Sequence, residues 1–220
     1  MISKKSLSKK LKGLYVIIDP EVCAFAKNVP LSVAKVCLKG GVKVIQLRYK
    51  NAADNAVLLL AERIKKECKK HKALFIMNDR ADLAALCGAD GLHLGQEDLS
   101  VHDARNIFKG FIGVSTHNAA EITKALKDKA DYIGFGPVFA TTTKKGLPDT
   151  VGIKELSAAV KKVSVPVVAI GGINGNNIGE VYGTGVNCAA VISAICGKRI
   201  RNKSVNCKIS IAKSSKGALE

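Results

Sequence analysis

Two carboxylates follow two neighbouring apolar runs of this sequence. Asp79 comes directly after ALFIMN (73–78), and Asp98 follows DGLHL (90–94) after a short polar cluster. If both runs are strands of one sheet, the carboxylates lie at the same edge and repel one another unless a cation separates them. Mg²⁺ suits such a place, because it takes one or two carboxylates together with phosphate oxygens and water. The alternative for each aspartate is a cap on the helix that follows it.

Basic and amide side chains gather at the same predicted edge. In the stretch QLRYK, the period of two along a strand sends Gln46, Arg48 and Lys50 to one side. Arginine offers a planar fork of donors and lysine a mobile point charge, and both suit phosphate oxygens. Asn78 ends the next run, and Ser115 ends a later one. The pattern predicts an anion site beside the carboxylates, with a solvent-facing loop as the alternative for QLRYK.

A second anion site is predicted from the later part of the chain. The stretch GPVFATTTKKG is a long loop of hydroxyl, lysine and glycine residues, and its Lys144 is assigned to the first site. Glycine after the seventh run lets the backbone approach a ligand closely, although a tight turn also favours it. The candidates for the second site are Thr141, Thr142, Thr143, Gly172, Ile192 and Ser193. A cation bound beside the first site would suit a diphosphate ligand, whereas the second site suits a monophosphate. The residues therefore favour a reaction that joins two anionic substrates with loss of diphosphate.

Eight short apolar runs, separated by segments with helical spacing, supply the elements that position these groups. The runs cover residues 14–19, 43–48, 73–78, 90–94, 111–115, 132–136, 165–170 and 186–193. Near-continuous apolar strands indicate a parallel sheet that is covered on both faces. Eight strand–helix units predict an α/β fold, a single-domain (β/α)₈ TIM barrel with its functional groups at the carboxyl ends of the strands. An open doubly wound sheet is the alternative, which the lack of an early GxGxxG disfavours.

The composition and the cysteine pattern restrict the classes to which the protein can belong. The chain has 220 residues, of which 47% are hydrophobic, enough for one domain with a large core. No window approaches the roughly eighteen uninterrupted apolar residues of a membrane span, so we expect a soluble protein without a membrane partner. The seven cysteines form no CxxC pair, and none lies at metal-ligand spacing from a histidine. Buried free thiols and a cytoplasmic location are therefore expected.

The net charge of +17 is concentrated at the two ends of the chain. Residues 1–12 carry five Lys and no acid, and residues 198–220 carry seven Lys or Arg and one Glu. We therefore predict a basic N-terminal arm (1–12), a catalytic barrel (13–197) and a basic, partly disordered C-terminal tail (198–220). Such ends can bind RNA or anionic lipid, but solvated tails are commoner, and this tail lacks the interleaved aromatics of a single-strand binding surface. Small phosphorylated molecules are the expected partners rather than nucleic acid, and a homo-oligomer is compatible with the sequence.

Six motifs in order give the chain a close resemblance to the thiamine-phosphate synthase family. They are QLRYK, NDRADLAALCGADGLHLGQED, GVSTH, GPVFATTTKK, AIGGI and VISAI, and the resemblance runs from about Leu14 to Cys196. It implies a (β/α)₈ barrel and a transferase of thiamine biosynthesis, with Mg²⁺ as cofactor. Family members join a hydroxymethylpyrimidine diphosphate to a thiazole phosphate, giving thiamine monophosphate and diphosphate.

The resemblance also implies roles for particular residues. Asp79 and Asp98 would ligate Mg²⁺, while Lys144, Ser115 and Arg48 would be the catalytic residues. The pyrimidine diphosphate would be bound by Gln46, Leu47, Arg48, Tyr49, Lys50, Asn78, Ser115 and Lys144. The thiazole phosphate would be bound by Thr141, Thr142, Thr143, Gly172, Ile192 and Ser193. The family usually has Glu where Tyr49 stands, and this side chain is expected to point away from Arg48 and Lys50.

Two other functions remain open at this point. A thiazole tautomerase of the same superfamily would need the monophosphate site and an acid–base residue, but not the complete diphosphate and metal set. A non-catalytic barrel could instead bind nucleic acid or a membrane through its basic ends. No Ser–His–Asp or Cys–His constellation is evident, and His93 is explained as well by packing within a strand as by catalysis.

Overall fold

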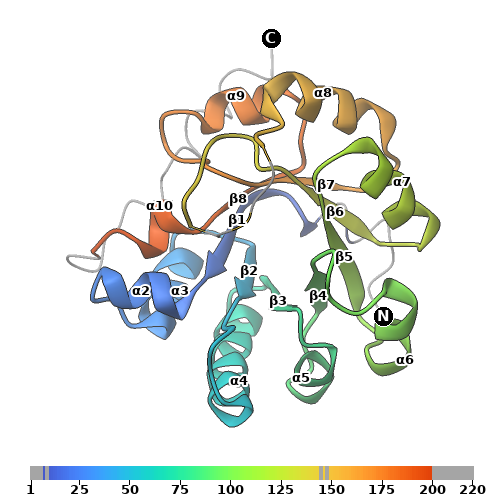
Figure 1. Cartoon of the computed structure of the whole chain (residues 1–220). Helices are drawn as coiled ribbons and strands as arrows, with labels where there is room; N and C mark the ends of the chain where they lie inside the picture. Colours follow the sequence, from blue (N-terminus) through green and yellow to red (C-terminus); the bar gives the residue numbers. More distant parts are fainter. Residues whose placement is uncertain (1–6, 8–9, 144–145, 147–148, 200–220) are drawn as a thin grey trace.

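Eight parallel strands close into a barrel that is ringed by helices (Figure 1). The computed structural model of the protein describes residues 7, 10–143, 146 and 149–199. The strands are β1 (Gly13–Ile18), β2 (Val44–Leu47), β3 (Leu74–Asn78), β4 (Gly91–Leu94), β5 (Phe111–Thr116), β6 (Tyr132–Phe135), β7 (Val167–Ala169) and β8 (Cys188–Val191). Each strand pairs with the next in the sequence, and β8 returns to pair with β1. The predicted (β/α)₈ barrel is therefore confirmed.

Helices connect the strands around the outside of the barrel. They are α2 (Pro20–Phe25), α3 (Pro30–Lys39), α4 (Asp54–Lys70), α5 (Ala81–Leu86), α6 (Val101–Ile107), α7 (Ala119–Lys127), α8 (Gly152–Lys162), α9 (Ile178–Gly183) and α10 (Ser193–Cys196). In α4 the buried residues Val57, Ala61, Ile64 and Cys68 recur every three or four positions, so one face of this helix packs inward. None of the described helices is long and apolar enough to cross a membrane.

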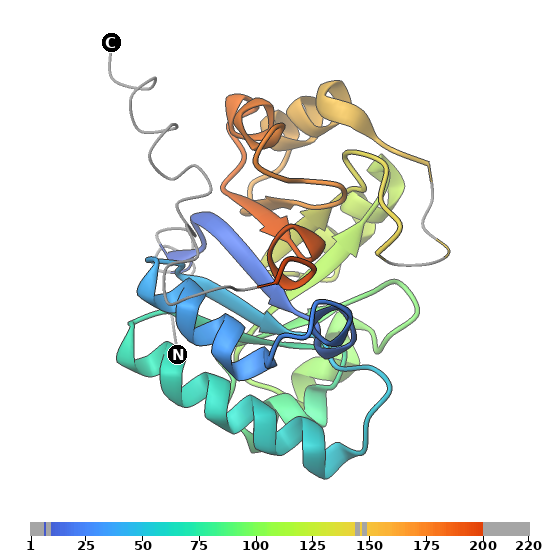
Figure 2. The ribbon, with the colours of Figure 1, turned by 90° about the vertical axis from the view of Figure 1, so that its left-hand side faces the viewer.

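The strands are apolar on both faces because each face is buried. On β1, Val16 and Ile18 pack in the outer core beneath the helices, whereas Tyr15 and Ile17 belong to a second core inside the barrel. This two-sided burial accounts for the near-continuous apolar runs of the sequence. Figure 2 shows the strands running in one direction, toward the side of the molecule where the loop after β6 extends.

The inner core also includes two leucines from the predicted N-terminal arm. Leu7 and Leu11 have exposed fractions of 2% and 0% and cluster with the inward-facing strand residues, among them Leu74 and Phe111. The arm is therefore apolar on one side as well as basic. The predicted boundaries of the arm and the tail stay predictions, and most of the tail lies outside the described residues.

The described cysteines are all free thiols. Five of these six are buried, and Cys87 is half-buried. The expectation of buried free thiols holds for this part of the chain, while Cys207 lies outside the described residues.

Candidate active site at the barrel mouth

A pocket opens at the carboxyl ends of the strands and gathers most of the predicted site residues. Every strand, or the loop that follows it, contributes to the lining. The predicted residues among those lining it are Gln46, Arg48, Asn78, Ser115, Thr141, Thr143, Gly172, Ile192 and Ser193. Groups assigned to two separate anion sites from the sequence therefore share one pocket.

Six of the described predicted residues do not line this pocket: Lys50, Asp79 and Asp98 lie beside it, and three others direct their side chains elsewhere. Leu47 is fully buried in the outer core, and Tyr49 packs against the same core, away from the side on which Arg48 lines the pocket. Thr142 is exposed and stands between the two threonines that line the pocket. These three residues can meet a ligand only through their backbone or after a rearrangement. Lys144 lies outside the described residues.

The guanidinium of Arg48 is held by a buried carboxylate that sequence analysis missed. Arg48 Nη1 lies 2.5 Å from Asp19 Oδ2. The other oxygen of Asp19 accepts hydrogen bonds from the N–H groups of Glu21 and Val22, at 3.0 and 3.2 Å, and so caps α2. The signal was present in the sequence, because Asp followed by Pro is typical of a helix N-terminus. Asp19 thus fixes the position of Arg48 at the rim of the pocket.

Asp79, Lys50 and Asp98 form a charged cluster beside the pocket. Lys50 Nζ lies 2.7 Å from Asp79 Oδ2, and the Asp79 and Asp98 carboxyls interact directly. Burial, followed by the Asp98 carboxyl, raises the pKa of Asp79 above its ordinary value, and this outweighs the opposing effect of Lys50. Asp98 is oriented by the Gly95 N–H, which donates to its Oδ2 at 2.6 Å.

The helix-capping alternative for the two aspartates is wrong. Helix α5 begins at Ala81, and no side chain caps it. Helix α6 begins at Val101 and is capped by Ser100, whose hydroxyl accepts from the Asp103 N–H at 3.1 Å. Asp79 instead takes a left-handed backbone conformation with φ of 62°, and its N–H donates to the His93 carbonyl. The two aspartates are therefore free of a capping role and face one another.

The donor set at this pair fits a hard divalent cation. The pKa of Asp79 is raised by burial and by the neighbouring Asp98 carboxyl, so a cation bound between the two carboxylates would reduce their repulsion. Within the described residues there is no group of three or more His, Cys, Asp or Glu side chains that could enclose a metal. Mg²⁺ commonly keeps several waters and takes further oxygens from substrate phosphates, so a pair of carboxylates is enough for it.

The loops after β6 and β7 are held together at the opposite side of the mouth. The Val138 N–H donates to the Ile170 carbonyl at 2.9 Å, and the Phe139 N–H donates to the Gly171 carbonyl at 3.1 Å. Gly172 has φ of +63°, and a Cβ there would lie 2.5 Å from the Ala140 carbonyl oxygen. Glycine is thus required for the backbone to pass this close to the threonine loop.

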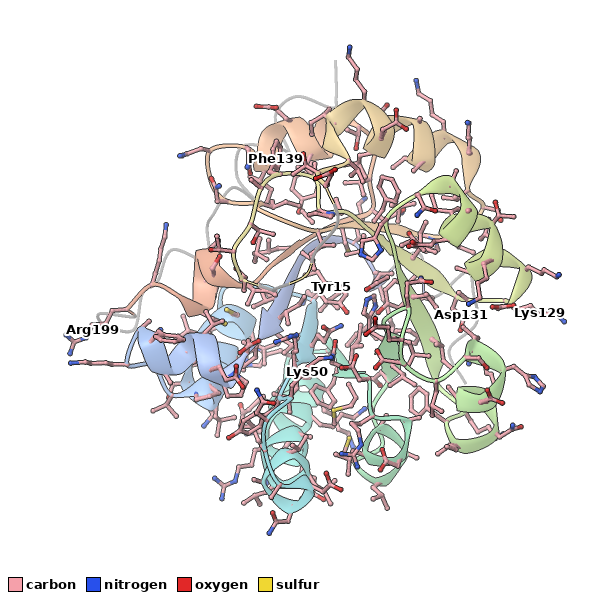
Figure 3. The ribbon with its side chains drawn as sticks, viewed as in Figure 1. Tyr15, Lys50, Lys129, Asp131, Phe139 and Arg199 are labelled. Atoms are coloured by element: carbon pink, nitrogen blue, oxygen red, sulfur yellow. The ribbon has the colours of Figure 1, made fainter. Side chains whose placement is uncertain are left out.

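A chain of hydrogen bonds runs from the interior of the barrel to Ser115. Gln46 Nε2 donates to the Tyr15 hydroxyl at 2.7 Å, and this hydroxyl lies 3.2 Å from that of Tyr132. The Tyr132 hydroxyl lies 2.8 Å from His93 Nδ1, and His93 Nε2 lies 2.9 Å from Ser115 Oγ. Figure 3 shows Tyr15 near the centre of the ring of strands. His93 is therefore both packed in a strand and connected to a predicted site residue.

Glycines on the neighbouring strands make room for these rings. A Cβ on Gly113 would lie 2.0 Å from Cζ of Tyr132, and a Cβ on Gly134 would lie 3.2 Å from Cε1 of His93. Burial raises the pKa of Tyr132 and that of Tyr15 well above the ordinary value, so both phenols stay neutral. A weak signal for this arrangement was present in the sequence, since two of the predicted strand runs each contain a tyrosine.

The fold and the site define a (β/α)₈ barrel with a pocket at the carboxyl ends of its strands that gathers basic, amide and hydroxyl side chains. The sequence model described as thiamine monophosphate synthase matches residues 14–195. The chain therefore belongs to this family, as the six motifs predict.

Known proteins of the family cover most of the chain. The chain is 42% identical over 184 residues to a thiamine-phosphate synthase from Lawsonia intracellularis. The aligned region covers 83% of this chain and 84% of that protein. A thiamine-phosphate synthase from Prochlorococcus marinus is also 42% identical over 185 residues, but the chain spans only 51% of its length. Among solved structures, thiamine phosphate pyrophosphorylase from Pyrococcus furiosus has a TM-score of 0.79 and 38% identity, covering 87% of this chain and 90% of that one.

Proposed function

We propose that the chain is a thiamine-phosphate synthase. It joins 4-amino-2-methyl-5-(diphosphooxymethyl)pyrimidine to 4-methyl-5-(2-phosphooxyethyl)thiazole and releases thiamine monophosphate and diphosphate. The single observation that carries the proposal is the convergence of both predicted phosphate-binding groups on one pocket. Family membership over residues 14–195 supports it.

The proposed reaction is dissociative. The bond between the pyrimidine methylene carbon and the diphosphate oxygen breaks, and the electron pair leaves with the diphosphate. The amino group of the pyrimidine ring stabilises the resulting cation, and the lone pair of the thiazole nitrogen then forms the new carbon–nitrogen bond. Such a reaction needs no strong base or nucleophile from the protein. Its rate depends on stabilising the departing charge and aligning the two partners.

The residues of the first site would act on the departing diphosphate. Arg48, already oriented by Asp19, presents its guanidinium at the rim, and Ser115 presents a hydroxyl inside the pocket. Lys50 would add positive charge, as would Lys144 from the loop after β6. Gln46 and Asn78 line the pocket between these groups and would position the pyrimidine diphosphate.

Asp79 and Asp98 are the residues that would hold Mg²⁺. When bound, the ion would neutralise part of the charge on the diphosphate as this group leaves. Lys50, which lies against Asp79, would then be available to contact a diphosphate oxygen.

The second site would hold the phosphate of the thiazole. Thr141 and Thr143 line the pocket beside the backbone of Gly172, and Ser193 at the start of α10 lines it as well. The Asn174 and Asn177 side-chain amides both donate to the Gly172 carbonyl, at 3.1 and 3.0 Å, and so fix this peptide in place. A fixed backbone is what alignment of the thiazole nitrogen requires.

A product assay tests the proposal directly. The purified full-length chain is mixed with both substrates, and thiamine monophosphate is measured, with each substrate omitted in turn as a control. We expect product only when both substrates are present. Aromatisation of a thiazole phosphate without thiamine monophosphate would favour the tautomerase alternative. Cytoplasmic location and a homo-oligomeric state stay predictions.

A further inference from the structure

We propose that Tyr132 holds His93 as its Nε2–H tautomer, so that His93 donates to Ser115 and leaves the Ser115 proton for a ligand in the mouth. Tyr132 and His93 are then positioning residues that act through Ser115. The role of that proton toward diphosphate rests on the proposed function, whereas the tautomer itself does not.

The direction of the hydrogen bonds follows from the number of protons available. A tyrosine hydroxyl has one proton to donate. Because Tyr15 accepts from Gln46 Nε2, its own proton is directed to the other hydroxyl within reach, that of Tyr132 at 3.2 Å. Tyr132 therefore accepts from Tyr15, and its proton is directed to His93 Nδ1 at 2.8 Å.

The state of His93 follows from the same argument. A neutral imidazole that accepts at Nδ1 carries its proton at Nε2, which lies 2.9 Å from Ser115 Oγ. The serine oxygen accepts this proton, so the serine's own proton is not used toward His93. Gln96 does not compete for it, since Gln96 Nε2 donates to the Ser115 backbone carbonyl rather than to the hydroxyl. Ser115 lines the pocket and can donate there.

Packing keeps this chain of donors in place. Tyr15 and Tyr132 have exposed fractions of 2% and 0%, so water does not replace either hydroxyl. The absence of side chains at Gly113 and Gly134 lets the rings of Tyr132 and His93 approach the strand backbone closely. In the reverse direction, with Gln46 presenting its carbonyl to Tyr15, Ser115 would donate to His93 and would offer the mouth only an acceptor. An acceptor there would repel a phosphate oxygen.

Long-range proton–nitrogen NMR spectra of protein with ¹⁵N-labelled histidine test the tautomer. The chain has four histidines, and comparison with a His93→Gln variant assigns the His93 signals. We expect the wild-type protein at neutral pH to show a protonated Nε2 and an unprotonated, hydrogen-bonded Nδ1. Protonation at Nδ1 in the wild type would overturn the proposal without any need for a variant.

Two phenylalanine variants give a matched comparison. Tyr132→Phe removes the donor to Nδ1, so we expect the Nδ1 signal to shift and a population protonated at Nδ1 to appear. Tyr182→Phe removes a tyrosine hydroxyl of α9 that lies outside this chain of hydrogen bonds, so the tautomer should be kept. A His93 spectrum that is unchanged by Tyr132→Phe would contradict the proposal.

A double-mutant cycle tests whether the effect passes through Ser115. Tyr132→Phe should lower kcat roughly tenfold, the size expected for one misdirected hydrogen bond to a charged group, with a smaller change in KM. In a Ser115→Ala background the same change should cost little. Equal losses in both backgrounds would show a merely structural role. If neither the wild type nor any variant makes thiamine monophosphate, the proposed function is wrong. The NMR spectra would still determine the tautomer of His93.

Discussion

The charge cluster of Lys50, Asp79 and Asp98 shows how single residues are tuned at this mouth. Asp79 is placed by a left-handed backbone conformation and by a hydrogen bond from its N–H to the His93 carbonyl. Lys50 Nζ lies 2.7 Å away on one side, and the Asp98 carboxyl faces it on another. Burial and the Asp98 carboxyl together outweigh Lys50 in raising the pKa of Asp79, and the proposed Mg²⁺ would reduce the repulsion between the two carboxylates.

The raised pKa of Asp79 predicts a pH dependence of stability in metal-free protein. The unfolded Asp79 loses its proton near pH 3.8, whereas the folded one keeps it to higher pH. Its contribution to stability is fully present below that pH and is lost as pH rises through the folded pKa. Asp79→Asn should therefore raise the melting temperature relative to wild type more at pH 7 than at pH 3.5. An equal difference at both pH values would contradict the shift, and added Mg²⁺ should reduce the difference at pH 7.

Lys144 offers a second prediction at the scale of a residue. If it contacts the departing diphosphate, Lys144→Ala should lower turnover by roughly 10²–10³-fold, the scale of one lost electrostatic donor in a transition state. Steady-state assays with saturating substrates measure this change, and Lys161→Ala, at an exposed lysine in the last turn of α8, is the control. Near-normal turnover in Lys144→Ala would remove this residue from the first site.

At the scale of elements, the strands could be predicted closely because each carries its own signal. The run predicted over 111–115 is the strand Phe111–Thr116, and the run predicted over 73–78 is Leu74–Asn78. The last strand, Cys188–Val191, is shorter than the predicted run, which extends to residue 193. It ends at Val191 because Ile192 is the N-cap residue of α10. Hydrophobic periodicity is local, which explains why it locates elements and not their exact ends.

Contacts across the barrel could not be predicted in the same way. The hydroxyls of Tyr15 and Tyr132 meet although 117 positions separate them, and their pairing depends on strand register. The caps proposed for Asp79 and Asp98 were wrong for a related reason. Asp79 contacts Lys50 and Asp98, which come from the ends of other strands. The two aspartates make these contacts and do not cap the helices that follow them.

The N-terminal arm provides a prediction for an element. Leu11 is fully buried in the inner core, so Leu11→Ala should lower the free energy of unfolding by about 2–5 kcal/mol. Leu59, on α4, has an exposed fraction of 52%, and Leu59→Ala should change this free energy by less than about 0.5 kcal/mol. Urea denaturation of the two variants measures both values. Equal stability of the two would show that the arm does not contribute to the core.

At the scale of the whole molecule, the chain combines a closed barrel with strongly basic ends. The net charge is +17, and residues 198–220 carry seven Lys or Arg and one Glu. The pocket at the mouth is lined by Arg48 and by the amide and hydroxyl side chains proposed to bind phosphorylated substrates. The basic ends would raise the encounter rate with any anion and need no specific partner for this effect.

Removal of residues 200–220 separates the catalytic account from a nucleic-acid or membrane one. We expect the truncated chain to keep thiamine monophosphate synthesis, because the mouth lies within the residues that remain. Binding to RNA or to anionic vesicles, measured at low salt, should weaken in the truncated chain. Loss of synthesis together with folding judged normal by circular dichroism would assign the tail a part in the reaction.

The most direct measurement of the central claim is the rate of thiamine monophosphate formation as a function of Mg²⁺ concentration, in wild type and in Asp98→Asn. Both substrates are present, and EDTA-treated protein gives the starting point. We predict that the wild-type rate rises from near zero and saturates, and that Asp98→Asn needs far more Mg²⁺ and binds diphosphate more weakly. Identical Mg²⁺ curves for the two proteins, or full synthesis in EDTA, would contradict an aspartate pair that holds magnesium against the departing diphosphate.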